Sequence, residues 1–450
     1  MNTPATTNPR PSDPQGSGVK GDVLIDVRNL STWFQTSSGL FSRGKQEAVR
    51  AVDGVSFDIR RGEIFGLVGE SGSGKTTLGR TILGLVQATS GEVLWKGHDL
   101  AKISQKEFRP LRRHLSMIFQ DPNASMNPAM TISQGVGHPL RIHGLVSSRA
   151  EMRAAVVEML ERCGLAPGER FLDRYPEDIS GGQKQRCVIA RSLITKPEFV
   201  VADEPVASLD MSVRAKVLEL MIDLKDDLGL TYLYITHDLA SSRFVCDRMA
   251  IMYLGQMIEW GDAKKIYDDP QHPYTRALLD AIPLPDPTRR NRERALPSGE
   301  IPDAQNPPAG CRFHPRCPVA LSSCGWEGRD LIDVMEQRWT TVSQDVFEAE
   351  LGIFGDLAHA AASRTDLRLP GADSGQVRGL LDRVGEQLPP GLADSIESIE
   401  PDDDGNTVVR FGFGPEPDAQ NVNGRIVSCH QHGVTRRPGG SHGGRVPTQG

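Results

Sequence analysis

The chain has 450 residues, 38% of them hydrophobic and 24% charged, which is typical of globular proteins and is long enough for two or three domains. Its formal net charge of −7 argues against general nucleic-acid binding, which needs a basic face toward the phosphates. The sequence has no run of about 18 apolar residues, and residues 1–21 lack the apolar segment of a signal peptide, so we expect a cytosolic protein with a disordered N-terminal tail.

Short apolar runs alternate with helical patterns between residues 22 and 283. The patterns predict strands at residues 22–26, 52–59, 64–68, 115–119, 199–202, 231–236 and 249–252. They predict helices at residues 77–83, 151–163 and 213–228. Asp53-Gly54 is typical of a hairpin or a tight bend near the first two strands. This alternation predicts an α/β domain over residues 22–283, built around a mainly parallel sheet.

The loop between the strand at 64–68 and the next helix matches the phosphate-loop pattern at every fixed position. Its residues are Gly69, Glu70, Ser71, Gly72, Ser73, Gly74, Lys75 and Thr76, followed by Thr77 in the helix. Glycines let backbone amides converge on phosphate oxygens, while Lys75 adds a positive charge and Thr76 a hydroxyl for Mg²⁺. The segment from Gly69 to Thr77 therefore predicts a site for a nucleoside triphosphate.

Two further segments suit such a site. The strand at 199–202 runs into Asp203 and Glu204, where an aspartate can support Mg²⁺ and Glu204 is the candidate base for an attacking water. A second helix N-terminus suited to an anion is predicted because a serine cap and glycine amides open a helical stretch. That segment consists of Ser180, Gly181, Gly182 and Gln183.

Six motifs occur in the order found in ATP-binding cassette proteins, which the chain resembles. They are the phosphate loop, Ile118-Phe119-Gln120-Asp121-Pro122, Ile179-Ser180-Gly181-Gly182-Gln183, Asp203-Glu204-Pro205, Ser208-Leu209-Asp210 and Ile235-Thr236-His237-Asp238. The resemblance implies a P-loop NTPase core with a helical subdomain. It also implies a dimer in which two such domains close head to tail over two ATP molecules.

The resemblance implies a role for each matched residue. Lys75 would hold the β- and γ-phosphates, and Thr76 and Asp203 would support Mg²⁺. Gln120 would contact metal and water, Glu204 would be the general base, and His237 would hold the γ-phosphate and water. Asp210 would link the two sites, and the partner's ATP would be served by Ser180, Gly182 and Gln183. The family often supplies an aromatic ring for adenine where this chain has Arg50. A guanidinium can stack on a base, and Trp33, Phe34 and Phe41 are alternatives.

Further segments resemble the ATPase subunits of bacterial dipeptide and oligopeptide importers. They cover residues 51–57, 120–128, 252–255, 272–275 and 310–318. The resemblance implies a peripheral subunit at the cytoplasmic face of the cell membrane, acting with a second and different ATPase, two transmembrane permeases and an extracytoplasmic solute-binding protein, and not with nucleic acid. Nickel and glutathione importers share this ATPase type. A non-transport cassette ATPase and a redox-sensing subunit with little turnover are the alternatives.

Proline is frequent after residue 283, which predicts a domain boundary, an extension over residues 284–431 and a disordered tail over residues 432–450. Within the extension, residues 327–421 are strongly acidic, with a helical pattern at 342–361 and a strand pattern at 407–413.

The extension also carries a cysteine cluster. Cys311, Cys317 and Cys324 are separated by five and six residues, unlike the two-residue knuckles of structural zinc. The importer resemblance implies a 4Fe-4S cluster with Cys429 as the fourth ligand, and Zn²⁺ or thiols without metal are the alternatives. Cys163, Cys187 and Cys246 are expected to be packing residues.

Overall fold

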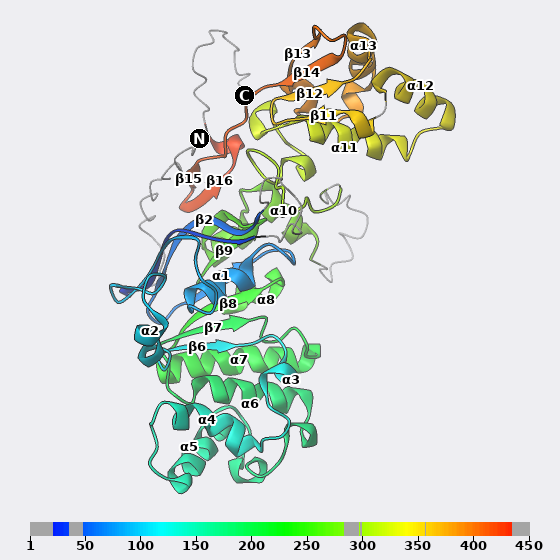
Figure 1. Cartoon of the computed structure of the whole chain (residues 1–450). Helices are drawn as coiled ribbons and strands as arrows, with labels where there is room; N and C mark the ends of the chain where they lie inside the picture. Colours follow the sequence, from blue (N-terminus) through cyan, green and yellow to red (C-terminus); the bar gives the residue numbers. More distant parts are fainter. Residues whose placement is uncertain (1–20, 36–47, 283–296, 298, 356, 434–450) are drawn as a thin grey trace, which may run out of the picture. The chain divides into compact units, whose positions relative to one another are not determined.

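The computed structural model describes residues 21–35, 48–282, 297, 299–355 and 357–433 (Figure 1). The chain divides into two compact units. The first contains the residues up to 308 with 316–318 and 421–427, and the second contains 309–315, 319–420 and the residues from 428 onward. The predicted boundary after residue 283 and nearly all of the two predicted tails lie outside the described residues.

The first unit is built on an eight-stranded sheet of order β15-β16-β10-β9-β3-β8-β7-β6. Its five parallel strands are β9 (Arg248–Tyr253), β3 (Ile64–Val68), β8 (Thr231–Thr236), β7 (Phe199–Asp203) and β6 (Leu115–Ile118). β10 (Gln256–Asp262) pairs antiparallel with both β9 and β16 (Arg425–Ser428), beyond which lies β15 (Ala419–Val422). β3, β7 and β8 are buried on both faces, as expected of parallel strands covered by helices. The predicted α/β architecture is confirmed.

A second sheet in the same unit is antiparallel, with order β2-β1-β4-β5. Its strands are β1 (Val23–Gln35), β2 (Ala48–Arg60), β4 (Ser90–Trp95) and β5 (His98–Asp99). Its apolar side chains, including Leu30 and Val52, share one core with Phe65 of β3. The predicted hairpin at Asp53-Gly54 is wrong. Both residues lie inside β2, at a register shift against β1 where Gly54 has a φ of 68°.

Helices flank the parallel sheet, and three of them pack on one another as a helical layer: α4 (Ile132–Ile142), α5 (Arg149–Arg162) and α6 (Gly181–Leu193) (Figure 1). The helices predicted at 77–83, 151–163 and 213–228 are found as α1 (Lys75–Ile82), α5 and α7 (Met211–Leu228). α5 and α7 begin earlier than predicted because Ser148 and Asp210 cap them. The other helices of this unit are α2 (Gln105–Leu111), α3 (Pro122–Ser125), α8 (Leu239–Val245), α9 (Ala263–Asp268) and α10 (Pro273–Asp280).

The second unit contains a four-stranded antiparallel sheet of order β11-β12-β14-β13 with helices on it. Leu367 and Val409 of the sheet are fully buried, as are Leu331 and Val377 of the helices. The acidic stretch is thus a folded module. Its elements are α11 (Gly328–Trp339), α12 (Gln344–Phe354), β11 (Ala361–Ala362), β12 (Asp366–Leu369), α13 (Ser374–Val384), α14 (Leu392–Ser395), β13 (Ile396–Pro401) and β14 (Thr407–Phe411).

Short 3-10 turns complete both units, at Gly168–Phe171, Pro176–Asp178, His314–Arg316, Ser322–Cys324, Leu357–His359, Gly385–Gln387 and His430–His432. Of the helices in the described residues, none is both long enough and apolar enough to span a membrane.

Candidate nucleotide-binding site

The phosphate loop joins β3 to α1, and two glycines fit it against neighbouring backbone. Gly74 has a φ of 101°, and a Cβ there would lie 1.9 Å from the carbonyl oxygen of Ala51 in β2. A Cβ on Gly69 would lie 2.2 Å from the carbonyl oxygen of Met252 in β9. No other residue type fits these positions without moving the strands. The loop is therefore held in place by both sheets of the first unit.

Lys75 lies inside this loop, where it is 5% exposed. Its Nζ donates to the carbonyl oxygens of Gly69 at 2.9 Å and Glu70 at 2.7 Å, and to Ser73 Oγ at 3.3 Å. Burial lowers the pKa of Lys75, and the nearby carboxylates, led by Glu204, oppose this shift. The ammonium is thus held where the motif predicts a phosphate-binding charge.

Thr76 and Asp203 come together although they are far apart in the sequence. Thr76 Oγ1 donates to Asp203 Oδ1 at 2.9 Å. Asp203 is 2% exposed at the end of β7, and burial raises its pKa while the hydrogen bond from Thr76 lowers it. Hydroxyl and carboxylate oxygens are the ligands that Mg²⁺ prefers. The donor set fits the predicted Mg²⁺ site.

Three side chains meet where neighbouring parallel strands end. Glu204 follows β7, Gln120 follows β6 and His237 follows β8. Glu204 Oε2 accepts from Gln120 Nε2 at 3.0 Å and lies 3.1 Å from His237 Nδ1. Glu204 has a φ of 47°, an uncommon conformation for a residue other than glycine that is frequent at functional sites. The three predicted catalytic residues thus form one cluster.

A cavity of about 670 Å³ contains this cluster and the phosphate loop. Its volume lies in the range of small-molecule sites. Arg50 also lines it, with the guanidinium 4.9 Å from the centre of the Trp33 ring and Nη1 3.7 Å from Asp53 Oδ2. Leu278 and Ala304 line the cavity as well, and sequence reasoning missed both because they lie outside every motif. Phe41 lies outside the described residues.

The second predicted anion site lies at the start of α6 and does not line this cavity. Ser180 Oγ accepts from the Gln183 amide at 3.3 Å, and Gln183 Oε1 accepts from the Ser180 amide at 3.0 Å. Gly181 is exposed, while Gly182 is half-buried. Asp210, also exposed, caps α7, and its hydrogen bond from Ser212 lowers its pKa. Ser180 and Asp210 thus cap helix N-termini that do not line the cavity of the subunit's own phosphate loop.

The second unit holds three of the predicted cluster cysteines, each no more than 8% exposed: Cys311, Cys324 and Cys429. The Cys311 amide donates to the Cys324 carbonyl at 2.9 Å, and burial raises the pKa of the Cys324 thiol to about 11. Cys317 belongs to the first unit. No group of three or more His, Cys, Asp or Glu that could hold a metal ion occurs among the residues with described positions.

The comparisons with known proteins agree with the nucleotide site. Residues 52–207 match the family described as "ABC transporter", and residues 258–324 match "Oligopeptide/dipeptide transporter, C-terminal region". YkfD of Bacillus subtilis (strain 168) is 49% identical, over 70% of this chain and 92% of that protein. The oligopeptide transport ATP-binding protein AppF of the same organism is 45% identical, over 67% and 92%.

A third relative, the oligopeptide transport ATP-binding protein OppF of Salmonella typhimurium, is 43% identical over 67% of this chain and 90% of that protein. These relatives are matched over nearly their whole length, and both family matches lie in the part of the chain that carries the motifs. The chain therefore belongs to the ABC transporter family, among the ATP-binding subunits of the oligopeptide/dipeptide type.

Proposed function

We propose that the chain is the ATP-hydrolysing motor subunit of an importer that takes up dipeptides or oligopeptides. The observation that carries this proposal is the convergence of Lys75, Thr76 and the Glu204 cluster on one cavity, with Asp203 hydrogen-bonded to Thr76. Binding groups for a triphosphate and a base for water are thereby combined in one place. The names of the relatives AppF and OppF support peptides as the transported solute.

Each residue of the site would have its own role in ATP hydrolysis. Lys75 and the loop amides would bind the β- and γ-phosphates, and Thr76 and Asp203 would hold Mg²⁺, which neutralises phosphate charge. Glu204 would accept the proton of the attacking water. Gln120 and His237 contact the Glu204 carboxylate and would orient that water and the γ-phosphate. Arg50, stacked on Trp33, would contact the adenine.

A second ATPase subunit would complete each site. Ser180, Gly182 and Gln183 do not line the cavity of their own subunit, and they would serve the ATP of a partner, with Asp210 beside the interface. ATP would then bind more tightly to the closed pair than to the open pair, and this difference in affinity would drive closure. We propose that the partner is a related but different subunit.

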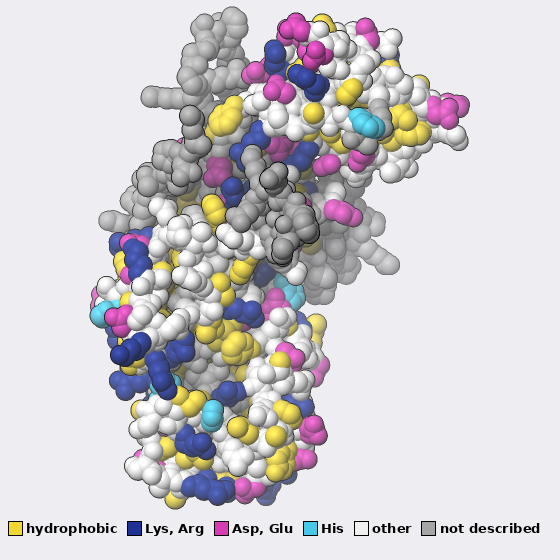
Figure 2. All heavy atoms as spheres, viewed as in Figure 1, with side chains coloured by type: hydrophobic (Ala, Val, Ile, Leu, Met, Phe, Trp, Pro, Cys, Tyr) yellow, Lys and Arg dark blue, Asp and Glu magenta, His cyan; other side chains and the backbone are white. Residues whose placement is uncertain are grey.

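A groove beside the site offers a surface for a permease. It has a volume of about 230 Å³ and is lined by Leu85 and Phe119, whose side chains are 51% and 41% exposed. Arg112 and Arg191 also line it, and Figure 2 shows Lys and Arg side chains gathered over α2. We propose that a short cytoplasmic helix of each permease docks here, at the inner face of the membrane, while a solute-binding protein acts outside.

Binding of ATP and Mg²⁺ to the full chain tests the nucleotide site. We expect Lys75→Ala to weaken binding by at least tenfold, because the ammonium is the charge inside the loop. Lys102→Ala is the matched control, since Lys102 is 63% exposed and pairs with Glu92. Equal affinity in both variants would contradict the assignment.

The solute is tested by purifying the complex with its permeases and identifying the bound solute by mass spectrometry. Short peptides are expected, whereas nickel or glutathione would support the other importers of this type. Purification with ribosomes and without permeases would support a non-transport ATPase.

The iron-sulfur cluster remains a prediction from Cys311, Cys317, Cys324 and Cys429. After anaerobic purification, about four irons per chain would support it. One zinc per chain would support the alternative site. If neither metal is found, the four cysteines are thiols without metal. No step of the proposed mechanism depends on the outcome.

A further inference from the structure

Glu70, the second residue of the phosphate loop, is held at three points. Its amide donates to the Tyr274 hydroxyl at 3.0 Å, and its carbonyl accepts from Lys75 Nζ at 2.7 Å. Its carboxylate accepts from both terminal nitrogens of Arg316, at 2.9 Å and 3.3 Å. The phosphate-loop pattern leaves this position open to any residue type. The bonds therefore belong to this chain's own architecture and not to the motif.

Arg316 is brought to the loop from far along the chain and is buried there. It is 8% exposed, and its Nη1 also donates to the Tyr253 hydroxyl at 3.3 Å. Residues 316–318 are part of the first unit, although the residues before and after them belong to the second. A buried two-point contact between guanidinium and carboxylate fixes both distance and orientation. Glu70 is therefore held rigidly on the side of Arg316.

Tyr274 is positioned independently of Arg316. It lies in the first turn of α10, where the ring of His272 accepts its amide at 3.1 Å. The carboxylate of Glu259, in β10, accepts the amides of Gln271 and His272, each at 2.9 Å. Tyr253 and Tyr274 lie with ring centres 4.7 Å apart. The backbone of Glu70 is thus anchored through α10 to the sheet, and its side chain is anchored to Arg316.

We propose that Arg316 is a positioning residue for ATP binding: it neutralises the Glu70 carboxylate and fixes the first turn of the phosphate loop. This inference rests on the proposed nucleotide site. An unpaired carboxylate in the loop would repel the triphosphate, and in a partly buried site that repulsion is weakly screened. With Arg316 in place, Glu70 presents a neutral pair to the phosphates. Arg316 does not line the nucleotide cavity itself, so it acts through Glu70.

Charge-neutralising variants of the full chain test this role. We expect Arg316→Gln to raise the Kd for ATP and Mg²⁺ by about tenfold, because it leaves the Glu70 charge unpaired. Glu70→Gln should bind ATP within about threefold of the wild type, since the loop then carries no extra negative charge. The double variant should recover most of the affinity lost in Arg316→Gln. In the assembled complex, KM for ATP should rise in Arg316→Gln while kcat stays nearly unchanged.

Arg338→Gln is the matched control. Arg338 forms a similar partly buried ion pair with Glu350, but in the second unit. It should leave ATP affinity unchanged. If Arg316→Gln does not fold, Arg316→Lys tests the positioning role, because it keeps the charge and loses the two-point contact. We expect it to bind ATP more weakly than the wild type, by less than the tenfold expected of Arg316→Gln.

The inference is overturned if Arg316→Gln or Arg316→Lys binds ATP as the wild type does, or if the double variant is as weak as Arg316→Gln. Lys75→Ala separates this outcome from failure of the proposed function. When Lys75→Ala loses binding and Arg316→Gln does not, the nucleotide site stands and only the role of Arg316 is rejected. When the wild type itself binds no ATP, the proposed function is rejected.

Discussion

Glu204 combines a strained backbone with a carboxylate that faces two polar side chains. Its amide donates to the Ile235 carbonyl at 2.9 Å, which ties the residue to β8 beside the end of its own strand. Its side chain is 17% exposed, so the carboxylate can meet a water molecule while Gln120 and His237 hold it in position. The adjacent Asp203 is instead turned to Thr76. Two neighbouring carboxylates thus have separate contacts and separate predicted roles.

Glu204→Gln tests whether Glu204 acts as the base for water while Asp203 and Thr76 serve the binding of ATP and Mg²⁺. We expect ATP turnover of the assembled complex to fall by about 10²- to 10⁴-fold, because an amide cannot accept the proton of the attacking water. ATP binding should change little, since Lys75, Thr76 and Asp203 are untouched, and crosslinking with ATP should show a trapped closed pair of ATPase subunits. Glu92→Gln, at an exposed carboxylate paired with Lys102, is the control. Turnover unchanged in Glu204→Gln would remove Glu204 from the role of base.

At the scale of single elements, the phosphate loop depends on space between β2 and β9. Gly74→Ala would place a methyl group against the Ala51 carbonyl, at 1.9 Å before any movement. We expect the loop to shift and ATP affinity to fall by more than tenfold. The free energy of unfolding should also fall, by more than the about 1 kcal/mol that a left-handed conformation alone costs alanine. Isothermal titration calorimetry and urea unfolding measure the two effects.

Gly97→Ala separates strain from steric contact. Gly97 has a φ of 82°, similar to that of Gly74, but a Cβ there meets nothing within 4 Å, and the residue lies in the turn between β4 and β5. We expect this variant to lose only the conformational term and to bind ATP normally. Equal losses of affinity in both variants would show that the close approach to Ala51 does not matter.

The sequence predicted the elements in which a strong local pattern and a fixed motif coincide. β3, β8 and α7 were found within two residues because apolar runs and helical periodicity are local signals. The hairpin at Asp53-Gly54 was wrong because the bulge in β2 has the same turn residues. Most of the second unit was missed because its strands are short, at two to six residues, and only partly apolar.

The candidate site was predicted where motif residues carry the chemistry. Lys75, Thr76, Asp203, Glu204, Gln120 and His237 all lie at one site. The contacts of Arg316 and Tyr274 with Glu70 were not predicted, since they join residues more than 200 positions apart. No periodicity or spacing rule reports such a pair.

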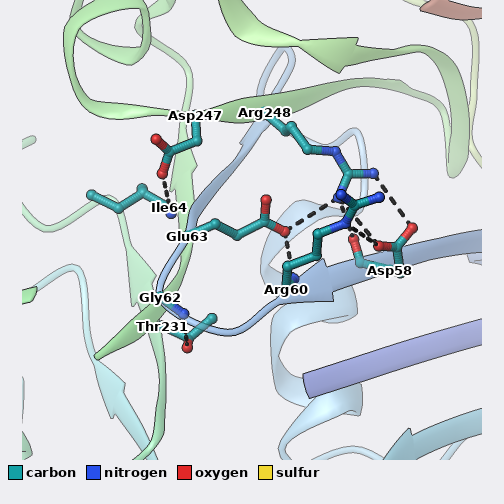
Figure 3. A network of polar contacts seen from close by, with 8 residues as sticks. All are labelled: Asp58, Arg60, Gly62, Glu63, Ile64, Thr231, Asp247 and Arg248. Carbon is teal, nitrogen blue, oxygen red and sulfur yellow. Dashed lines mark hydrogen bonds and ion pairs between the residues drawn. The ribbon is translucent and has the colours of Figure 1, made fainter. Parts of the chain in front are cut away.

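At the scale of the first unit, a buried charge network joins its two sheets (Figure 3). Arg248 of β9 lies 3.3 Å from Asp58 of β2 and 3.3 Å from Glu63, in the turn before β3. Glu63 is fully buried and accepts the Arg60 amide at 2.6 Å. Asp247 accepts the Ile64 amide at 2.8 Å, which holds the same turn. Removing one partner of such a network leaves another charge buried without compensation, which is strongly destabilising. The network therefore fixes how β2 packs against β3 and β9.

Glu63 makes the stability of this unit depend on pH. Burial raises the pKa of Glu63 from 4.5 to about 7, while Arg248 opposes the shift and Asp58 and Asp247 add to it. Because the folded state holds this proton more tightly than the unfolded state, the stabilising contribution is complete below about pH 4.5 and is lost as pH rises to about 7. A shift of this size corresponds to about 3 kcal/mol across the window.

We therefore expect Glu63→Gln to flatten the pH dependence of the free energy of unfolding between pH 5 and 7, because glutamine cannot release a proton. Urea unfolding of the full chain across this range, with wild type and variant compared at each pH, measures the difference. Glu219→Gln, at an exposed position of α7, should keep the wild-type slope. Parallel curves for wild type and Glu63→Gln would show that Glu63 is ionised in the folded protein throughout, with the charge of Arg248 outweighing the burial of the carboxylate.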